Sequence, residues 1–208
     1  MSVSEDRTAQ PSVQPAVPAS GIADPAPLGL AAFALTTFLL SAANANWMTA
    51  ASGNAWIGYA LAYGGLCQLL AGMWEFRNRN VFGATAFATY GGFWIGLGLW
   101  ALLIAPHIAT ANAAAHDLGW ILLAFAIFNT YMLIMSAQVN LAVFAVFLTL
   151  ELTLIFLAIG NFTSSPGWTQ FGGYIGLLTA LVAWYTSAAG LANGLNGRLR
   201  IPVGKPLI

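Results

Sequence analysis

The stretch LAVFAVFLTLELTLIFLAIG, residues 141–160, is apolar apart from two threonines and one charged side chain, Glu151. A helix needs about 20 predominantly apolar residues to cross the hydrocarbon core of a bilayer, and this run has that length. It shows no alternation of apolar and polar residues, the pattern typical of a membrane β-strand. The stretch therefore predicts a transmembrane α-helix.

The rest of the chain has the same character. Of the 208 residues, 59% are hydrophobic and 6% are charged, whereas about 25% of the residues of a soluble domain are charged. Between residues 81 and 197 the only charged side chains are Asp117 and Glu151. This composition predicts an integral membrane protein. The formal net charge of zero gives no electrostatic attraction to nucleic acid, so no nucleic-acid partner is expected.

Six apolar runs can be read as membrane helices, at about residues 28–43, 55–76, 81–105, 118–137, 140–160 and 169–195. Lipid offers no partners for backbone polar groups, so each run is expected to be helical, and short connections predict antiparallel neighbours. The sequence thus predicts an all-α membrane protein with a six-helix transmembrane domain in residues 23–197. A Pro-, Ser- and Ala-rich N-terminal tail, residues 1–22, is expected to be disordered and not to be a cleavable signal peptide.

The basic residues predict the orientation of the chain. Two lie between the second and third runs, and three follow the sixth run, namely Arg77, Arg79, Arg198, Arg200 and Lys205. With six crossings both groups fall on the same side, which the positive-inside rule makes cytoplasmic. Both termini, including the C-terminal tail 198–208, are therefore expected in the cytoplasm, and the membrane is expected to be a bacterial-type plasma membrane.

Two runs resemble each other. YGGFWIGLGLWALL, residues 90–103, and FGGYIGLLTALVAWY, residues 171–185, both begin with aromatic–Gly–Gly–aromatic. They are three crossings apart and would run in opposite directions, which is typical of an inverted three-plus-three repeat. Chance recurrence in a glycine-rich chain is the alternative. Each run also has two glycines four residues apart, a spacing that allows close helix packing either within one subunit or between subunits.

Four blocks resemble the acetate uptake transporter family, also called the succinate–acetate permeases of the GPR1/FUN34/YaaH type. They are DPAPLGLAAFALTT (24–37), YGGLCQLLAGMWEFRNRNVFGATAFATYGGFW (63–94), LAIGN (157–161) and NGLNGRLRIPVG (193–204). The first block resembles the family signature NPAPLGL through Pro25, Pro27, Leu28 and Gly29. It departs from that signature at Asp24, where the family usually has Asn.

The resemblance implies a fold, an assembly and a substrate. It implies six-helix protomers assembled as a homohexamer, each with its own path for acetate and similar small monocarboxylates, with protons as a candidate co-substrate. In the family that path narrows at an aromatic–apolar constriction. The corresponding positions in this sequence are Phe33, Tyr90 and Leu150.

Uncharged polar residues in the runs are candidates for the path. A carboxylic acid like that of Asp or Glu has a pKa near ~4, so at neutral pH it is an anion that needs hydrogen-bond donors in the membrane. The predicted path residues are Thr36, Thr37, Asn44, Gln68, Thr89 and Asn161, whereas Asn129 and Thr130 are assigned to helix packing. The alternative is that all these groups join helices to one another.

The acidic residues raise separate questions. Pro25 and Pro27 suit the first turn of a helix, whose free N–H groups attract anions, but Asp24 places a negative charge there. Asp24 is expected either to oppose anion capture or to pair with a basic residue of the C-terminal tail. Glu151 is a candidate proton site, or else a neutral acid bonded to a neighbouring helix. Glu75 and Arg79, four residues apart, predict a surface ion pair.

Other classes of function are less well supported. A channel for urea, amides or ammonia is an alternative within transport, and an acetate sensor is an alternative outside it. An enzyme is not expected, because no run contains a nucleophile–base pair, paired acids or a histidine. No cofactor or metal site is expected either, since the chain has a single cysteine, Cys67, and two histidines in a predicted outer loop.

Overall fold

The computed structural model describes residues 21–48, 53–195 and 197–208. Throughout this part of the chain every regular element is a helix and no strand occurs. Five helical segments among the described residues are long and apolar enough to cross a membrane. The prediction of an all-α, multi-pass membrane protein is thereby confirmed. Nearly all of the predicted disordered tail, residues 1–22, lies outside the described residues.

The helices follow the predicted runs closely. The elements are α1 (Ala26–Asn44), α2 (Trp56–Leu61), η1 (Ala62–Cys67), α3 (Gln68–Arg77), α4 (Val81–Leu99), η2 (Trp100–Ile104), η3 (Ala105–His107), α5 (Ala111–Ser136), α6 (Leu141–Phe162) and α7 (Pro166–Gly194). The second run is continuous from α2 to α3, with a π-helical turn, η1, in its middle. Helix α4 likewise continues through the π-helical η2 and the 3₁₀ turn η3.

One boundary differs clearly from the expectation. The stretch between the third and fourth runs was expected to be a loop up to Asp117, but α5 already begins at Ala111. Thr110 caps this helix, since its hydroxyl accepts a hydrogen bond from the Ala113 N–H at 3.2 Å. Alanine has a high helix propensity, so the alanine-rich segment after Thr110 is helical. The segment is too short and too polar to be recognised in the sequence as part of the fourth apolar run. His116 and Asp117 therefore lie on α5 and not in a loop.

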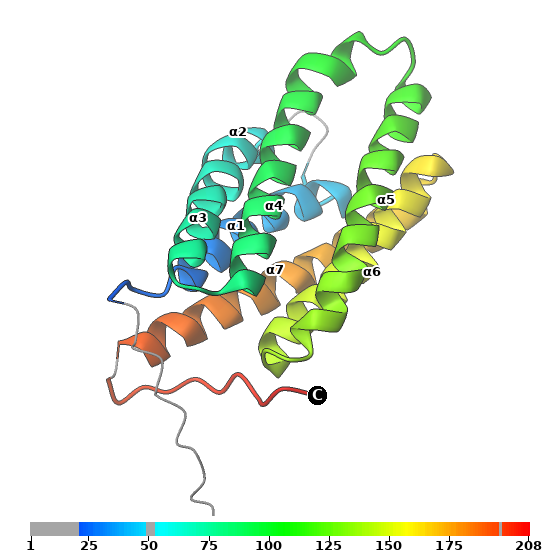
Figure 1. Cartoon of the computed structure of the whole chain (residues 1–208). Helices are drawn as coiled ribbons and strands as arrows, with labels where there is room; N and C mark the ends of the chain where they lie inside the picture. The colour runs from blue at the N-terminus through cyan, green and yellow to red at the C-terminus, as the bar shows by residue number, and fades with distance from the viewer. Residues whose placement is uncertain (1–20, 49–52, 196) are drawn as a thin grey trace, which may run out of the picture.

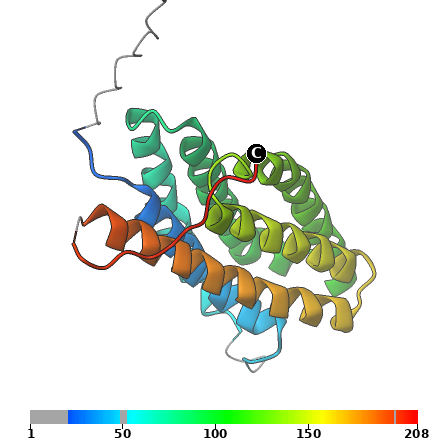
Figure 2. The ribbon, with the colours of Figure 1, turned by 90° about the horizontal axis from the view of Figure 1, so that it is seen from below.

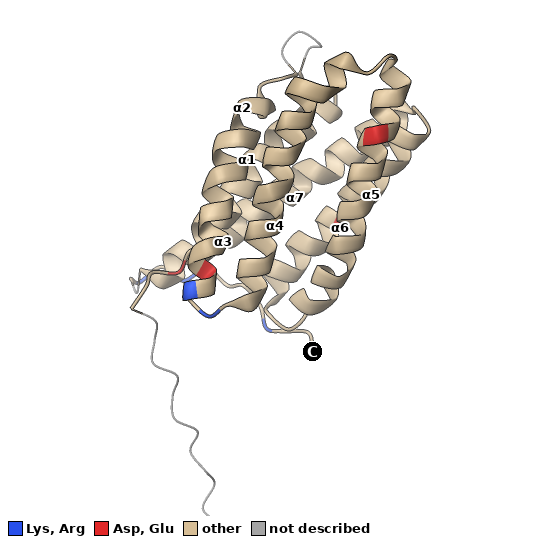
Figure 3. Cartoon of the chain, turned by 45° about the horizontal axis from the view of Figure 1, so that its top comes forward, with Lys and Arg blue, Asp and Glu red and all other residues tan. Residues whose placement is uncertain are grey.

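The helices form a bundle, and the first and last described segments of the chain lie at the same end of it. Helix α1 packs along α7, α6 lies between α5 and α7, and α3 packs against α4 (Figure 1). The segment before α1 and the segment after α7 both lie at one end of the bundle, here called the basal end. Figure 3 shows the Lys and Arg positions of the described chain at this same end.

The C-terminal segment runs back across the basal end (Figure 2). Asn193 exchanges two hydrogen bonds with Ile201, at 2.9 and 3.1 Å. Further along, the Ala142 N–H donates to the Val203 carbonyl at 2.9 Å, and the Leu207 N–H donates to the Ala137 carbonyl at 2.8 Å. The segment thus joins α7 to the start of α6.

Glycines allow the closest helix contacts. A Cβ atom at Gly91 would lie 2.6 Å from the Leu69 backbone nitrogen, so α3 and α4 meet there without room for a side chain. A Cβ atom at Gly172 would lie 2.9 Å from the Leu157 side chain, which brings α6 and α7 together in the same way. Both are the first glycine of an aromatic–Gly–Gly–aromatic motif. The second glycine of the first motif, Gly92, has no atom within 4 Å of such a Cβ.

The predicted surface ion pair between Glu75 and Arg79 is wrong. Helix α3 ends at Arg77, and Arg79 follows it in a left-handed conformation with φ 61°. Glu75 is 0% exposed, and its carboxylate accepts a hydrogen bond from the Asn78 side chain at 3.1 Å. The i, i+4 spacing assumed a helix that continues, but the turn into α4 carries Arg79 away from that face.

Adjacent glycines of the first motif provide a matched test of this packing. Gly91→Ala should lower the free energy of unfolding by about 1–3 kcal/mol, because the new methyl group would overlap the α3 backbone. At Gly92 a Cβ atom would meet no other atom of the chain within 4 Å, so Gly92→Ala should leave the stability of the isolated protomer unchanged or slightly raised. Unfolding midpoints of the two variants in the same detergent would measure the difference. Equal midpoints would contradict the close α3–α4 contact.

Candidate functional site

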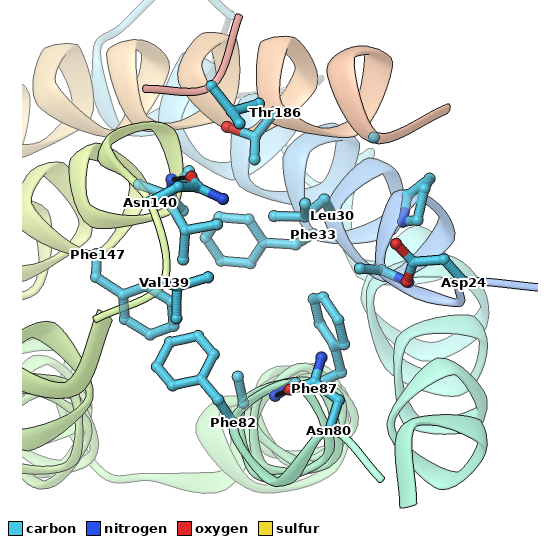
Figure 4. A pocket seen from close by; sticks show the side chains of 18 of the residues that line it. Asp24, Leu30, Phe33, Asn80, Phe82, Phe87, Val139, Asn140, Phe147 and Thr186 are labelled. Atoms are coloured by element: carbon cyan, nitrogen blue, oxygen red, sulfur yellow. Dashed lines mark hydrogen bonds between the residues drawn. The ribbon is translucent and has the colours of Figure 1, made fainter. Parts of the chain in front are cut away.

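A cavity of about 330 Å³ opens near the basal end of the bundle. We call it the basal cavity. Its wall combines polar residues with aromatic and aliphatic ones. The lining residues are Asp24, Ala26, Pro27, Leu30, Phe33, Gln68, Asn78, Asn80, Phe82, Gly83, Ala86, Phe87, Tyr90, Val139, Asn140, Val143, Val146, Phe147, Leu150, Thr186, Gly190, Asn193 and Val203. Figure 4 shows phenylalanines of α1, α4 and α6 facing the same space. The cavity therefore lies between helices far apart in the sequence.

The three predicted constriction residues all line this cavity. Phe33, Tyr90 and Leu150 are only 4%, 3% and 6% exposed, and they belong to one hydrophobic cluster. The rings of Phe33 and Tyr90 meet edge to face, with centroids 5.9 Å apart, a favoured geometry for aromatic pairs. We call these three residues the neck.

Gln68 lies at the level of the neck. Gly91, next to Tyr90, packs against Leu69, next to Gln68, and Gly64, one turn before Gln68, fits against Thr36 of α1. Gln68 follows the π-helical turn η1, and such turns frequently occur at functional sites. Its side chain is 2% exposed and lines the basal cavity. Its Oε1 atom has no hydrogen-bond partner among the described residues.

Tyr90 is tied to α5 and α6 by a chain of hydrogen bonds. Its hydroxyl donates to Asn129 Oδ1 at 2.7 Å. Asn129 is 0% exposed, and its Nδ2 group donates to the Phe147 carbonyl at 3.0 Å and to Glu151 Oε2 at 2.7 Å. The Thr130 hydroxyl lies 2.8 Å from the other carboxylate oxygen, Oε1. The neck is thus connected to the acid in the middle of α6.

These bonds determine the direction in which Tyr90 donates. An amide nitrogen has two hydrogens, and both of those on Asn129 have acceptors, so Oδ1 is the atom left for Tyr90. Oδ1 can only accept, and the Tyr90 proton must therefore point to Asn129. In this arrangement the hydroxyl has no second proton for a substrate carboxylate, and it offers the cavity only its lone pairs.

Asn129 and Thr130 are functional candidates that sequence reasoning assigned to packing. The sequence feature that could have identified them is Glu151, because a carboxylate within an apolar helix requires hydrogen-bond donors from a neighbouring helix. The sequence does not say which neighbour supplies them. The structure places both donors on α5, and it leaves Leu150 on the cavity side of α6 while Glu151 faces α5.

The signature residues lie at the start of α1, next to the basal cavity. Asp24 Oδ1 accepts a hydrogen bond from the Ala26 N–H at 2.9 Å, at the start of α1. The Pro27 carbonyl accepts from the Ser187 hydroxyl at 2.6 Å, which joins α1 to α7. Pro25 is buried, Leu28 is 47% exposed, and a Cβ atom at Gly29 would lie 2.7 Å from the Phe87 ring. Only Asp24 and Pro27 of this group line the cavity.

The expected pairing of Asp24 with a basic residue of the C-terminal tail finds no support at Arg200, which bonds the end of α7. Arg200 donates to the Asn193 carbonyl at 2.6 Å, at the end of α7. Asp24 itself is exposed at the cavity mouth. The carboxylate therefore accepts from the first N–H of α1 and places an acidic side chain at this entrance.

A second cavity, of about 360 Å³, lies at the opposite end of the bundle. We call it the apical cavity. It is mostly polar and is lined by Ala43, Asn44, Asn46, Ala111, Asn112, Ala115, Gly160, Asn161, Ser164, Ser165, Pro166 and Thr169. Two predicted path residues, Asn44 and Asn161, therefore lie here, where α1, α5, α6 and α7 end or begin.

The two cavities are separated by a packed interval of similar length on two helices. On α1, Phe33 lines the basal cavity and Ala43 the apical cavity; on α6 the corresponding residues are Leu150 and Gly160. Ten residues of helix span about 15 Å. Thr36 and Thr37 lie in this interval, and with Thr89 they line neither cavity, so their predicted role in the path stays a prediction.

Similar proteins share both the sequence and the fold. The GPR1/FUN34/yaaH family matches residues 6–205. Acetate permease A of Emericella nidulans is 41% identical over 211 residues, covering 93% of this chain and 70% of that protein. Ammonia transport outward protein 2 of Saccharomyces cerevisiae is 38% identical over 198 residues, with coverages of 93% and 70%. The succinate-acetate/proton symporter SatP of Escherichia coli is 34% identical over 185 residues, with coverages of 88% and 96%.

The solved structure of the bacterial acetate channel SatP is similar to this chain with a TM-score of 0.81 at 34% sequence identity. The similarity covers 88% of this chain and 99% of that one.

A double-mutant cycle tests the bond between Tyr90 and Asn129. Tyr90→Phe should lower the free energy of unfolding by about 1–3 kcal/mol, because it leaves a buried acceptor unpaired. In the double variant Tyr90→Phe, Asn129→Leu, the loss of unfolding free energy should be smaller than the sum of the two single losses, with a coupling free energy of about 1 kcal/mol or more. Unfolding of the four proteins in one detergent would measure it. Tyr131→Phe, at an exposed ring, is the matched control and should change the free energy of unfolding little. Strictly additive losses in the double variant would argue against the bond between Tyr90 and Asn129.

Proposed function

The chain belongs to the GPR1/FUN34/yaaH family, and we propose that it is a membrane transporter or channel-like permease for acetate and related small monocarboxylates. The observation that carries the proposal is that Phe33, Tyr90 and Leu150, the residues of the neck, are buried together in the lining of the basal cavity. Relatives named acetate permease and succinate-acetate/proton symporter support the choice of substrate. The structural similarity to an acetate channel supports the same choice.

The proposed path runs from the basal cavity through the neck to the apical cavity. Gln68 lies at the neck, and Asn44 and Asn161 supply amide groups at the apical end. Thr36 and Thr37 lie in the packed interval, and Thr89 precedes Tyr90. Amides and hydroxyls can bind a small carboxylate weakly enough to release it again, which conduction requires. Bulky neck residues would exclude larger solutes and hydrated ions.

The proposed topology has six crossings and both termini in the cytoplasm. The second crossing would be the continuous helical segment from Trp56 to Arg77, whose 22 residues would reach about 33 Å. Supporting this, the basic positions lie at the basal end together with both described ends of the chain. We assign residues 23–197 to the transmembrane domain, 1–22 to a disordered tail, and 198–208 to a cytoplasmic tail.

The inverted three-plus-three repeat gains support from the glycine contacts. In each half of the chain, the first glycine of the aromatic–Gly–Gly–aromatic motif packs against the preceding crossing, Gly91 against Leu69 and Gly172 against Leu157. The same motif thus serves the same contact in both halves. Such repeats place a transport site near the middle of the membrane.

We assign the protein to the plasma membrane as a homohexamer. Gly92 and Gly96 lie on α4 with open space where a side chain would be, and glycines four residues apart favour close helix contacts in lipid. This face is available to a second copy of the chain, whereas Gly172 and Gly176 are already used within the protomer. Native mass spectrometry from lipid nanodiscs would count the subunits.

Glu151 is the proposed proton site. As a carboxylate it accepts hydrogen bonds from Asn129 and Thr130. As a neutral acid it can donate to the Thr130 hydroxyl, because that hydroxyl also lies 2.9 Å from the Ala126 carbonyl and can donate there instead. Both protonation states therefore fit the same arrangement of heavy atoms, and a proton can be gained or lost without breaking the link to Tyr90.

A neutral solute such as ammonia is the second candidate substrate. One relative is named an ammonia transport protein, and the described lining of the basal cavity contains no Lys, Arg or His that would favour an anion. Uptake of labelled acetate into proteoliposomes, above that of protein-free liposomes, tests the leading proposal. Acetate uptake equal to the protein-free value, together with rapid ammonia flux, would favour the second candidate, and binding without flux would favour a sensor.

The width of the neck should determine the largest acid that passes. Phe33→Ala and Tyr90→Ala should each raise the uptake of larger monocarboxylates, such as butyrate, relative to acetate by about tenfold or more, because a bulky ring is removed. Proteoliposome uptake of both labelled acids would measure the ratio. Phe171→Ala, at a ring that is 47% exposed outside both cavities, is the control. Unchanged ratios would exclude these two rings from the path.

The proton role of Glu151 should be visible in the pH profile. Glu151→Gln keeps an acceptor and a donor in the network but removes the titration, so acetate uptake should vary less steeply with pH than in the parent protein. Uptake under imposed pH gradients would measure both profiles. Asp117→Asn, at an exposed acid on α5, should keep the parent profile. An unchanged profile in Glu151→Gln would dismiss the proton role.

A further inference from the structure

The charge in the lining of the basal cavity comes from one side chain, Asp24. Among the described lining residues it is the one charged group, and Lys, Arg and His do not occur there. Asp24 is exposed and directly precedes α1 at the basal end. Carboxyl groups exposed to water are ionised near neutral pH. A solute that enters from the basal end therefore meets an acidic group and no cation in the described lining.

The backbone of α1 holds this carboxylate at the edge of the cavity. Asp24 Oδ1 accepts a hydrogen bond from the Ala26 N–H at 2.9 Å. The intervening Pro25 is buried, and its ring restricts the backbone between the two residues. Figure 4 shows Asp24 bordering the same space as Asn80 and Val139. The acidic group thus has a defined place beside the entrance and is not a side chain that turns freely into solvent.

A second acid lies directly behind the wall of the cavity. Glu75 Oε2 accepts from the Asn78 side chain at 3.1 Å, and a Cβ atom at Gly83 would lie 2.7 Å from Glu75 Oε1. Asn78 and Gly83 both line the cavity. The cation of Arg200, by contrast, is bonded to the Asn193 carbonyl at the end of α7 and does not line the cavity. The acidic groups therefore border the described wall more directly than this cation does.

The volume of the basal cavity sets a weak limit on the solute. About 330 Å³ is within the range of pockets that hold drug-sized ligands, so a four-carbon acid with two carboxyl groups fits as readily as acetate. Charge discriminates more sharply than volume. Coulomb repulsion is proportional to the charge of the solute, so a dianion meets twice the repulsion of a monoanion at the same position. Apolar walls around the entrance concentrate this field.

We propose that Asp24 is a specificity-determining residue that limits entry into the basal cavity to solutes with at most one negative charge. Dicarboxylates such as succinate are dianions at neutral pH, and the charge of Asp24 excludes them before they reach the neck. A monocarboxylate enters against half of that repulsion, and a neutral solute enters against none. This inference rests on the proposed function and separates monocarboxylates from dicarboxylates within it.

The potential inside the cavity can be measured without transport. Val139 lines the cavity and is 38% exposed, so Val139→Cys, combined with Cys67→Ser to remove the native thiol, provides a reactive group there. Asp24→Asn keeps an oxygen that can accept from the Ala26 N–H but removes the charge. It should raise the ratio of modification rates by an anionic and a cationic methanethiosulfonate reagent about tenfold. In protein that retains Asp24, 1 M salt should raise the same ratio, because it shortens the screening length to about 3 Å.

Uptake ratios test the selectivity itself. In proteoliposomes at neutral pH and low salt, Asp24→Asn should raise the uptake of labelled succinate relative to that of labelled acetate about tenfold, because the repulsion of the second carboxylate is lost. Asp117→Asn removes an exposed acid of α5 that lines neither cavity, and it should keep the parent ratio. The two substitutions are chemically identical, so the comparison isolates the position of the charge.

The outcomes separate this inference from the proposed function. An unchanged succinate-to-acetate ratio in Asp24→Asn, or a parent protein that takes up succinate as readily as acetate, would overturn the inference while acetate transport stands. A ratio of reagent rates that responds neither to Asp24→Asn nor to salt would overturn it as well. Absence of acetate uptake above protein-free liposomes would overturn the proposed function, whereas the thiol reaction would still show whether Asp24 repels anions.

Discussion

Within a membrane-spanning bundle a polar group must find its hydrogen-bond partners inside the protein, because lipid supplies none. Asn129 meets this requirement fully, since its amide donates twice and accepts once among α4, α5 and α6. Gln68 meets it only in part, because its buried Oε1 atom has no hydrogen-bond partner among the described residues. Asn129 thus holds Tyr90 in place, whereas Gln68 is a proposed path residue that lines the basal cavity.

The same requirement gives Tyr90 its orientation. A phenol in an apolar cluster could rotate its proton toward any nearby acceptor, but the neighbouring Asn129 leaves it a single choice. Glu151 matters here although it lies outside the basal cavity, since it occupies one of the two amide hydrogens of Asn129. A charge in the middle of α6 is thereby connected to the narrowest part of the proposed path through two short hydrogen bonds.

Close helix contacts at glycines bring the residues of the candidate site to the same height in the bundle. Gly91 lets α4 approach the backbone of α3 at Leu69, and Gly64 lets η1 approach Thr36 on α1. Because the helices touch at these points, Gln68, Phe33 and Tyr90 lie at one height in the bundle, although they are far apart in the sequence. The repeated aromatic–Gly–Gly–aromatic motif was visible in the sequence. Which of its glycines face another helix of the same chain, and which face outward, was not.

Charge density and the length of apolar runs depend on composition and residue order alone, and they were enough to predict the class of the protein. The sequence located the helices within a few residues, except where the capping residue Thr110 extends α5, and its motifs identified the family that residues 6–205 match. Only the tertiary structure decided the partners of the polar residues. It buried Glu75 away from Arg79, made Asn129 the partner of Tyr90, and left the Gln68 Oε1 atom without a partner among the described residues. The physical reason is that two side chains form a hydrogen bond only if they lie on helix faces that contact each other. The sequence pattern of an apolar helix does not specify which of its faces contacts which neighbouring helix.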